Sequence, residues 1–456
     1  MEVELAADQQ RCLDSLIWAI KELEGQVEQT QFERIAELII ATMTGPWRYF
    51  HTPEHIFEVG ESGDAVEVLS ALFHDLVYVQ VDQGVSINIS RHIAPFIKEV
   101  RGELVILPED ELPKDQMFDL AAAIFGFVPN QSSSPFAGQN EFLSAVIAAQ
   151  SLEPFLKPSA IAEILACIEA TIPFRSNSST GLSCSDILYQ RLVAANHQFN
   201  LGLKDAEIVE AVKRAVRLGN RDVENFATQH SAHFLDNTWN LLPETNHQLI
   251  NPNSYTVSGY RTSLQKMEGF ISFLKPEVVF HQFQGYPDDQ SFAELVARTK
   301  KNLEVAKLYL GIKLTTIALV EALSCRIGLD IPISTMMGEL PACGQKVAWL
   351  EHYLPAVNNS YNAVNCIQNE VFELLDKGRS QESAYDLKNS PLATFIIKSV
   401  GFEQSQSLLI RAKEFFKGDI EAEDFLKDCH PDLVAALTEA VAQLFDTRKA
   451  ALHGVY

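Results

Sequence analysis

Two short blocks of this chain carry side chains of the kinds that bind metal ions and move protons. The first block reads Trp-Arg-Tyr-Phe-His-Thr-Pro-Glu-His-Ile-Phe-Glu-Val and contains His51 and His55. The second block reads Leu-Ser-Ala-Leu-Phe-His-Asp-Leu-Val-Tyr and contains His74 and Asp75. Neutral imidazoles and carboxylates are common ligands of divalent first-row metal ions. The two blocks together therefore predict a metal site.

The first block has the features of a helix start. Thr52 is a good N-cap residue and Pro53 suits the first helical position, which predicts a helix that begins at Pro53. His55 then lies in the first turn of this helix, whereas His51 lies just outside it. We expect both imidazole rings to line the same cleft.

The second block predicts a buried helix with a charged pair at its edge. Apolar residues recur there at helical spacing and form the buried face: Leu69, Leu72, Phe73 and Leu76. His74 and Asp75 fall at the shoulder of that face, where a buried charge is costly unless it is paired or bound to a metal. An isolated His-Asp pair is usually an ordinary part of a core. The preceding His-x-x-x-His element favours the metal site instead.

These residues resemble the HD-domain phosphohydrolase superfamily. The shared features are His-x-x-x-Val, an apolar helix that ends in Ala-Leu-Phe-His-Asp, and a later Asp. The segments Phe-His-Thr-Pro-Glu-His and Phe-His-Asp-Leu-Val-Tyr are similar to the corresponding segments of a group of bacterial metal-dependent HD proteins. The His-x-x-x-His element is also similar to that of cyclic-nucleotide phosphodiesterases. The resemblance covers about the first half of the chain.

The resemblance implies a ligand set, a cofactor and a reaction. It implies that His55, His74, Asp75 and a distant Asp hold a divalent metal ion, with Mn, Fe, Zn and Mg as the candidates. It also implies that His51 acts as the general acid on the leaving oxygen. The expected activity is hydrolysis of a small phosphorylated molecule, for which a nucleotide phosphoester is the leading candidate.

Two aspartates compete for the place of the distant ligand. Asp222 ends a helical pattern and is followed by polar residues that can line a site, and it is the preferred candidate. Asp186 is the competitor, although it equally suits the N-cap of a helix that begins at Ile187. Arg221, next to the preferred aspartate, is either a phosphate contact or an ordinary surface charge.

The chain also departs from the HD pattern. Proteins with two metal ions use further His or Asp residues soon after the His-Asp pair, but residues 76–80 of this chain read Leu-Val-Tyr-Val-Gln. The related bacterial group carries a Glu-rich stretch farther on, whereas residues 85–90 contain no acid. These departures favour a single metal ion. They also keep open a second hypothesis, a non-catalytic HD-type regulatory or scaffold protein that binds a ligand or a partner protein.

Helical periodicity dominates the elements that must position these side chains. It recurs in residues 160–170, 205–218, 292–310 and 433–445, and strand-like runs are confined to Val79–Val85 and Leu104–Leu107. We therefore predict an all-α fold, an HD-domain-like helical bundle with an additional C-terminal helical region. The loop-like segment Pro243–Tyr260 predicts a boundary between an HD-type metal-binding domain, residues 1–250, and a helical domain of unknown role, residues 260–456.

Composition narrows the possible partners. The formal net charge of −24 disfavours binding to nucleic-acid polymers and anionic membranes, but a bound cation still permits a small phosphorylated ligand. The seven cysteines form no Cys-x-x-Cys pair, the N-terminus is acidic, and the apolar runs are too short to cross a bilayer. We therefore expect a cytoplasmic protein. The C-terminal half can form a homodimer or bind a protein partner.

Overall fold

The structure, a computed structural model, describes residues 2–100, 103–132, 134, 137–251, 254–340, 348–357, 365–444 and 449–453. These residues form twenty α-helices and one two-stranded antiparallel sheet, in which Ile97 pairs with Ile106. The prediction of a predominantly helical fold is confirmed. The chain divides into two compact units, which are described in turn.

The first unit comprises Met1–Glu224 and Lys275–Ala297. Its helices are α1 (Glu2–Glu22), α2 (Gln29–Met43), α3 (Pro53–Gly60), α4 (Ala65–Phe73), α5 (Val79–Asp82), α6 (Ile87–Ile93), α7 (Gln116–Phe125), α8 (Gln139–Leu152), α9 (Pro158–Ala170), α10 (Cys184–Gln198) and α11 (Asp205–Asp222). The sheet consists of β1 (Ile97–Val100) and β2 (Glu103–Ile106).

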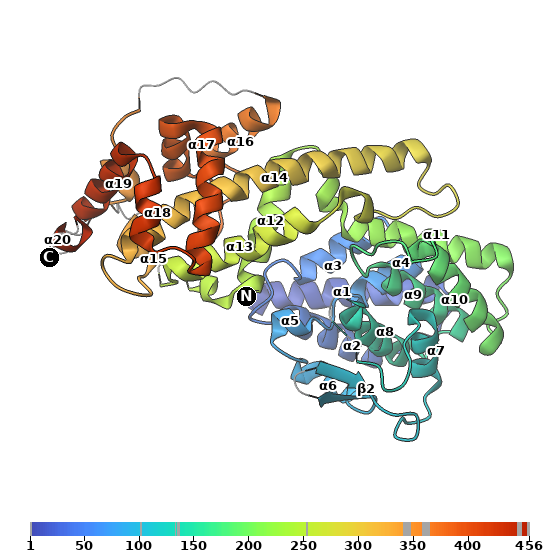
Figure 1. The fold of residues 1–456 in the computed structure, drawn as a ribbon. Coiled ribbons are helices and arrows are strands. Elements are labelled where there is room, and N and C mark those ends of the chain that lie inside the picture. The colour runs from blue at the N-terminus through green and yellow to red at the C-terminus, as the bar shows by residue number, and fades with distance from the viewer. Residues whose placement is uncertain are drawn as a thin grey trace. The chain divides into compact units, whose positions relative to one another are not determined.

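One continuous hydrophobic cluster fills the interior of the first unit. Its largest fully buried side chains include Phe32, Phe73 and Phe142, which come from α2, α4 and α8. Helix α4 packs against α1, α3 and α9, and α9 packs against α11 (Figure 1). Because α4 is central to this packing, the residues at its end are held by several neighbouring helices.

The second unit comprises Asn225–Leu274 and Arg298–Tyr456. Its helices are α12 (Ser231–Thr245), α13 (Val257–Phe273), most of α14 (Asp289–Ser324), α15 (Ile333–Met337), α16 (Cys366–Lys377), α17 (Pro391–Lys417), α18 (Ala422–Asp428), α19 (Pro431–Leu444) and α20 (Lys449–Leu452). The predicted domains differ from the compact units, because a later segment returns to the first unit and residues 225–250 belong to the second. The two-domain division stays a prediction.

One of the two predicted strands is wrong. Residues Val79–Asp82 form the short helix α5, in which the carbonyl of Tyr78 accepts bonds from the backbone N–H groups of Val81 and Asp82. Gln83 ends the turn in the left-handed conformation, with φ 58°. The alternating valines imitate a strand, but no neighbouring strand pairs with them in the described residues. The other predicted strand coincides closely with β2.

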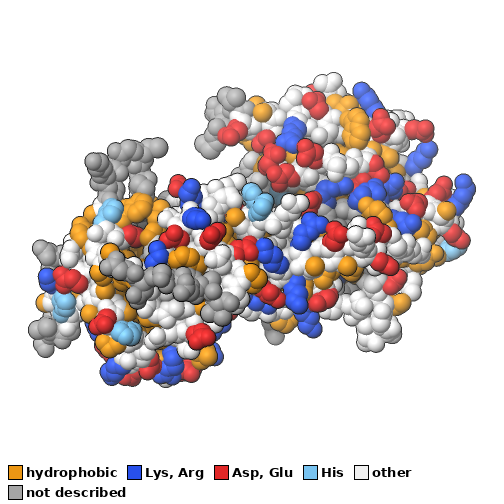
Figure 2. All heavy atoms as spheres, turned by 90° about the horizontal axis from the view of Figure 1, so that it is seen from above, with side chains coloured by type: hydrophobic (Ala, Val, Ile, Leu, Met, Phe, Trp, Pro, Cys, Tyr) orange, Lys and Arg blue, Asp and Glu red, His pale blue; other side chains and the backbone are white. Residues whose placement is uncertain are grey.

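Charged side chains of both signs are interspersed over the face of the molecule that Figure 2 shows. Among the described residues, no helix combines the length and the apolar character that a membrane span requires.

Candidate metal centre

Four side chains from three helical regions converge in the first unit. His55, His74, Asp75 and Asp222 each offer one imidazole nitrogen or carboxylate oxygen, and these four atoms all lie within 4.8 Å of one another. Nε2 of His55 lies 3.1 Å from Oδ1 of Asp222 and 3.4 Å from Oδ2 of Asp75. Nε2 of His74 lies 3.0 Å from the same Asp75 oxygen and 3.3 Å from the same Asp222 oxygen. Two imidazoles and two carboxylates therefore face a common centre.

His55 is placed by the start of α3. The helix begins at Pro53 with Thr52 in an extended N-cap conformation, as the sequence predicts, although the Thr52 hydroxyl makes no capping bond. The side chain of His55 points inward from the first turn and is nearly buried, at 9% exposure. Pro53 fixes the backbone at the point where the chain enters the helix. The ring therefore leaves a rigid element rather than a loop.

His74 is oriented by its second ring nitrogen. It occupies the C-cap of α4, and its Nδ1 lies 2.8 Å from the backbone carbonyl oxygen of Ala71. Because a carbonyl can only accept, Nδ1 carries the proton, and the lone pair of a neutral ring then sits on Nε2. This Nε2 is buried and makes no well-directed hydrogen bond within the described residues. Metal-bound histidines are commonly held in this way by a backbone carbonyl.

Asp222, and not Asp186, lies at the centre. Asp222 is the last residue of α11. Asp186 occupies the third position of α10, where its Oδ2 accepts bonds from the backbone N–H and the hydroxyl of Ser183. The helix begins at Cys184, so the expectation of Asp186 as an N-cap before Ile187 is wrong by three residues. Asp186 is part of a capping box instead.

Ion pairs fasten α11 to the start of α4. Glu67, whose side chain is 1% exposed, pairs with Arg217 at 2.7 Å and with Arg221 at 3.1 Å. Asp64, the N-cap of α4, pairs with Arg214 at 2.7 Å. Arg221 also donates to the carbonyl of Val59 at 2.7 Å, so it joins three helices. It is neither a free surface charge nor, in this arrangement, a phosphate contact.

A glycine lets α11 approach α9 closely. A Cβ added at Gly219 would lie 2.5 Å from the backbone oxygen of Ala170, the last residue of α9. Only glycine allows this approach, because a backbone oxygen cannot rotate out of the way. Gly219 precedes Asp222 by less than one helical turn. The close packing of these two helices therefore helps to set the position of the Asp222 carboxylate.

Arg48 supports the segment that carries Asp75. Its side chain is fully buried, with Nη1 2.6 Å from the carbonyl oxygen of Asp75 and Nη2 3.1 Å from that of Leu76. The guanidinium also binds both carboxylate oxygens of Asp82, at 3.1 and 2.7 Å. One arginine thus joins the end of α4 to α5. The sequence reasoning did not single out this residue.

Two carboxylates and two imidazoles this close together need positive charge between them, either protons on the imidazoles or a metal cation. Burial disfavours a charged His55, but the hydrogen bonds that its ring donates to the carboxylates of Asp222 and Asp75 outweigh burial and raise the pKa of His55 to about 9. For His74, burial likewise lowers the pKa, but the charges of Asp75 and Asp222 outweigh burial and raise the pKa well above its usual value. Burial disfavours the charged form of Asp222, yet the charge of His74 lowers the pKa of Asp222 to about 2. A divalent cation can take the place of those imidazole protons.

His51 lies at the edge of the centre. Its ring is 5.7 Å from the ring of His55 and 4.3 Å from that of Tyr78, both in edge-on geometry. It precedes α3 and is only partly buried. Burial raises the pKa of Asp75, but the charge of His74 and, after it, that of His51 outweigh burial. The pKa of Asp75 is therefore held well below its usual value. The imidazole of His51 thus lies beside the cluster without being one of its four members.

Glu141 is a further acid near the centre that the sequence reasoning missed. The first two turns of α8 bind the segment after Asp75, because the N–H of Val79 donates to Asn140 Oδ1 and that of Val77 donates to Ser144 Oγ. Oε2 of Glu141 is buried and without a hydrogen bond among the described residues. Burial, reinforced by Asp75 and Asp222, raises the pKa of Glu141 to about 8, and Arg175 opposes the shift. No motif in the sequence connects this residue with the cluster.

Arg175, which acts on the pKa of Glu141, shares one buried carboxylate with Arg191. Arg175 binds Glu169 through Nη1 at 2.6 Å and Nη2 at 3.2 Å, and Arg191 lies 3.4 Å from the same side chain. The Glu169 side chain is 1% exposed, whereas the two arginines are 23% and 33% exposed. Nε of Arg175 has no hydrogen bond within the described residues. Two positive charges against one negative charge leave a net positive region that suits an anion.

The charge of the imidazoles predicts that, as the pH rises, the stability of the metal-free protein falls whereas the affinity for metal increases. Without metal, the raised pKa of His55 contributes stability that is fully present below the unfolded-state value of 6.5 and is lost as the pH rises through about 9. Metal binds only the neutral ring, so metal affinity rises over the same interval, by up to about tenfold per pH unit for each displaced proton.

Two titrations between about pH 6 and pH 9 check this prediction. Thermal unfolding in the presence of a chelator should show falling stability as the pH rises, while calorimetric titration with Mn²⁺ should show tightening affinity. A metal affinity that stays constant over this interval would show that the ion does not displace the proton of His55.

The structure brings the predicted ligands and His51 together, and it adds Arg48, Glu141 and Arg175 around them. No protein-family model, curated protein or solved structure matches this chain.

Proposed function

We propose that this chain is a metal-dependent phosphohydrolase of the HD type that hydrolyses a phosphoester bond of a small phosphorylated molecule, with nucleotides as the leading candidates. The observation that carries the proposal is the convergence of His55, His74, Asp75 and Asp222 on one point, with His51 beside them. A cytoplasmic location is part of the same proposal.

The ligand set favours some metal ions over others. Mg²⁺ prefers oxygen ligands and retains several waters, whereas imidazole suits transition metals. Nitrogen from His55 and His74 with oxygen from Asp75 and Asp222 therefore favours Mn²⁺, Fe²⁺ or Zn²⁺. Leu76 and Val77, the residues after Asp75, are fully buried apolar side chains. This supports a site whose protein ligands hold one ion.

The roles of the side chains follow from their positions. A bound divalent ion supplies Lewis acidity, which lowers the pKa of a water and offsets the charge of a phosphoryl oxygen. His51 donates a proton to the leaving oxygen. Arg175 and Arg191, which share Glu169, bind an anionic group of the substrate. Glu141, whose raised pKa favours the protonated carboxyl, can hold a proton near the metal centre.

The second candidate function is an HD-type regulatory or scaffold protein that binds a ligand or partner without turnover. The observation that favours it is that, among the described residues, the group of ligand atoms that lie within 4.8 Å of one another has four members and so provides for one ion. Many phosphoryl-transfer sites use two ions to stabilise both the attacking and the leaving oxygen. Dimerisation or partner binding through the C-terminal half belongs to this candidate and stays a prediction.

Hydrolysis of phosphorylated substrates, followed by the appearance of the product expected from each, distinguishes the two candidates. The full chain, loaded with Mn²⁺, Fe²⁺ or Zn²⁺, is assayed with nucleoside mono-, di- and triphosphates, cyclic nucleotides and simple aryl phosphates. We expect hydrolysis of at least one class, and a loss of about 10²–10⁴-fold in kcat for His51→Ala, the range that general acid catalysis contributes.

Metal content of the variant separates catalysis from binding. His51→Ala should retain the wild-type metal stoichiometry, and His230→Ala, a substitution of an exposed histidine in the second unit, should retain both metal and activity. Metal-loaded protein that hydrolyses none of these substrates would contradict the enzyme and favour the binding protein. Loss of metal from His51→Ala would move His51 into the ligand set.

A further inference from the structure

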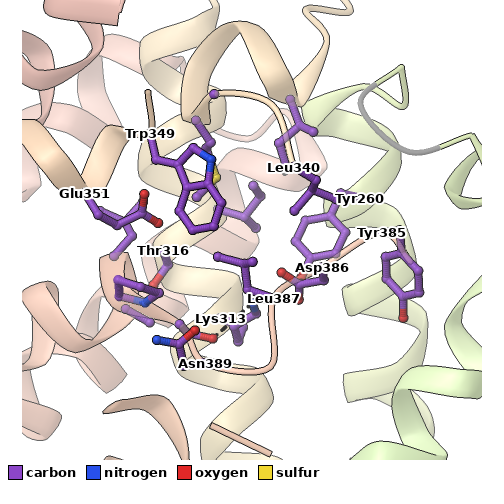
Figure 3. A pocket seen from close by; sticks show the side chains of 18 of the residues that line it. Tyr260, Lys313, Thr316, Leu340, Trp349, Glu351, Tyr385, Asp386, Leu387 and Asn389 are labelled. Atoms are coloured by element: carbon purple, nitrogen blue, oxygen red, sulfur yellow. Dashed lines mark hydrogen bonds and ion pairs between the residues drawn. The ribbon is translucent and has the colours of Figure 1, made fainter. Parts of the chain in front are cut away.

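A cavity of about 80 Å³ lies within the second unit, among α13, α14, α15 and the start of α17. Its wall is mainly apolar, with Ile317, Ile333 and Leu392 among the lining side chains. The polar and aromatic groups that also line it include Tyr260, Lys313, Trp349, Glu351 and Asp386 (Figure 3). The cavity is independent of the metal centre, because every one of its lining residues belongs to the other unit.

A fixed ion pair forms one side of the cavity. Nζ of Lys313 lies 3.0 Å from Oδ2 of Asp386 and 3.2 Å from Oγ of Ser390. The same Asp386 oxygen also accepts bonds from the hydroxyl of Tyr260 at 2.6 Å and from Nε1 of Trp239 at 2.9 Å. Three donors on one oxygen hold the carboxylate rigidly.

The ion pair retains capacity for a ligand. The three hydrogen bonds to the Asp386 side chain all reach Oδ2, so Oδ1 accepts none from the described residues. The Lys313 ammonium carries three donors and reaches two acceptors. The side of the cavity that these residues form can therefore both accept and donate a hydrogen bond.

The opposite side of the cavity carries two polar atoms that lack partners. Nε1 of Trp349 and Oε2 of Glu351 are buried and make no hydrogen bond within the described residues. In the view of Figure 3, the Glu351 carboxyl and the Asp386–Lys313 pair lie on opposite sides, and the Trp349 ring projects between them. Buried polar groups are normally paired, so unpaired ones in a cavity wall point to a missing partner.

We propose that this cavity binds a pyrimidine nucleobase. The base stacks on the Trp349 ring, and its amide-type edges, which alternate donors and acceptors, meet Glu351 on one side and Lys313 and Asp386 on the other. Stacking on an aromatic side chain together with hydrogen bonds to the edges is the general way in which proteins bind an isolated base.

Size and charge agree with this ligand. At about 10–15 Å³ for each water-sized atom, the cavity has room for roughly five to eight atoms, which is one substituted six-membered ring. Lys313 and Asp386 cancel each other in charge, and burial raises the pKa of Glu351 above its usual value, which favours its neutral form. A neutral ligand therefore fits better than an ion.

Calorimetry on the full chain with uracil, thymine and cytosine tests the proposal, and Trp fluorescence gives a second readout. We expect saturable binding of at least one base with a dissociation constant of ~1 mM or tighter, as is reasonable for about eight heavy atoms. Glu351→Ala and Trp349→Phe should each weaken this binding at least tenfold. Trp18→Phe, a substitution of an exposed residue in the first unit, should leave it unchanged.

The result should be the same with and without a chelator, so it does not depend on the proposed hydrolase. Thermal unfolding of each variant confirms that it is folded. No binding of any base up to its solubility limit would overturn the proposal. Binding that neither Glu351→Ala nor Trp349→Phe weakens would place the base elsewhere and also overturn it. Binding of benzoate but of none of the bases would assign the cavity to an aromatic anion instead.

Discussion

Replacement of Asp75 by alanine is expected to abolish stoichiometric metal binding. Its Oδ2 lies within 3.4 Å of the Nε2 atoms of both His55 and His74, so it shares the centre with each imidazole. A metal ion that binds only the folded chain raises the free energy of unfolding by about 3–4 kcal/mol when its concentration is 100–1,000 times its dissociation constant. For a unit of this size, that stabilisation corresponds to a rise in Tm of about 5–15 °C. The Asp75→Ala variant should show no such rise.

The measurement is metal content by mass spectrometry, combined with Tm in the presence of excess metal or of a chelator. Asp222→Ala should behave like Asp75→Ala. Asp186→Ala is the matched control, because it removes an aspartate from the same unit but only weakens the capping box with Ser183. It should keep the full metal stoichiometry. If Asp75→Ala and Asp222→Ala retain the wild-type metal content, the assignment of the centre is wrong.

Replacement of Arg48 by alanine is expected to destabilise the protein by about 3–5 kcal/mol, the range for breaking a buried ion pair from one side. The substitution would leave Asp82, 10% exposed, as an uncompensated charge. It would also remove the donors to the carbonyl groups of Asp75 and Leu76. Metal affinity should fall as well, because these bonds fix the end of α4.

Denaturant unfolding of the metal-free protein measures this loss without interference from the bound ion. Arg11→Ala is the control, since the Arg11–Glu54 pair has side chains that are 46% and 60% exposed. Exposed ion pairs contribute at most about 1 kcal/mol, so Arg11→Ala should change stability little. Equal effects of the two substitutions would contradict the supporting role of Arg48.

Local sequence was sufficient to predict the elements that present the two histidine blocks. Thr52 and Pro53 mark the start of α3 because capping and the fixed φ of proline act within a few residues. Leu69, Leu72 and Phe73 identify the buried face of α4 for the same reason, since helical spacing is a local property. The predominantly helical fold follows from many such segments.

The remaining parts of the centre depend on contacts between distant segments. Asp222 reaches His55 across 167 residues of chain, and no rule of spacing favours it over Asp186 until α11 is packed against α9. Glu141 stands 66 positions after Asp75, at the start of an apolar helix, where the sequence resembles an ordinary helix N-terminus. Tertiary packing brings these residues together, and single-sequence patterns do not contain it.

For helix α5, the local sequence pattern predicted the wrong secondary structure. Val79 and Val81 alternate with polar residues, which is the signature of a half-buried strand. The segment is instead a single helical turn held by Asp82, whose carboxylate binds Arg48. A long-range ion pair overrides the local strand preference. The sequence signal for this ion pair was Arg48 itself, which stands among aromatic residues. A buried arginine requires an acidic partner such as Asp82.

The most direct test of the proposed metal centre is a crystal structure of the full chain with Mn²⁺ or Zn²⁺, with anomalous diffraction measured at the absorption edge of the metal. We predict one anomalous peak about 2.0–2.2 Å from Nε2 of His55, Nε2 of His74 and one carboxylate oxygen each of Asp75 and Asp222. A peak elsewhere in the molecule, or no peak between these four side chains at saturating metal, would contradict the assignment.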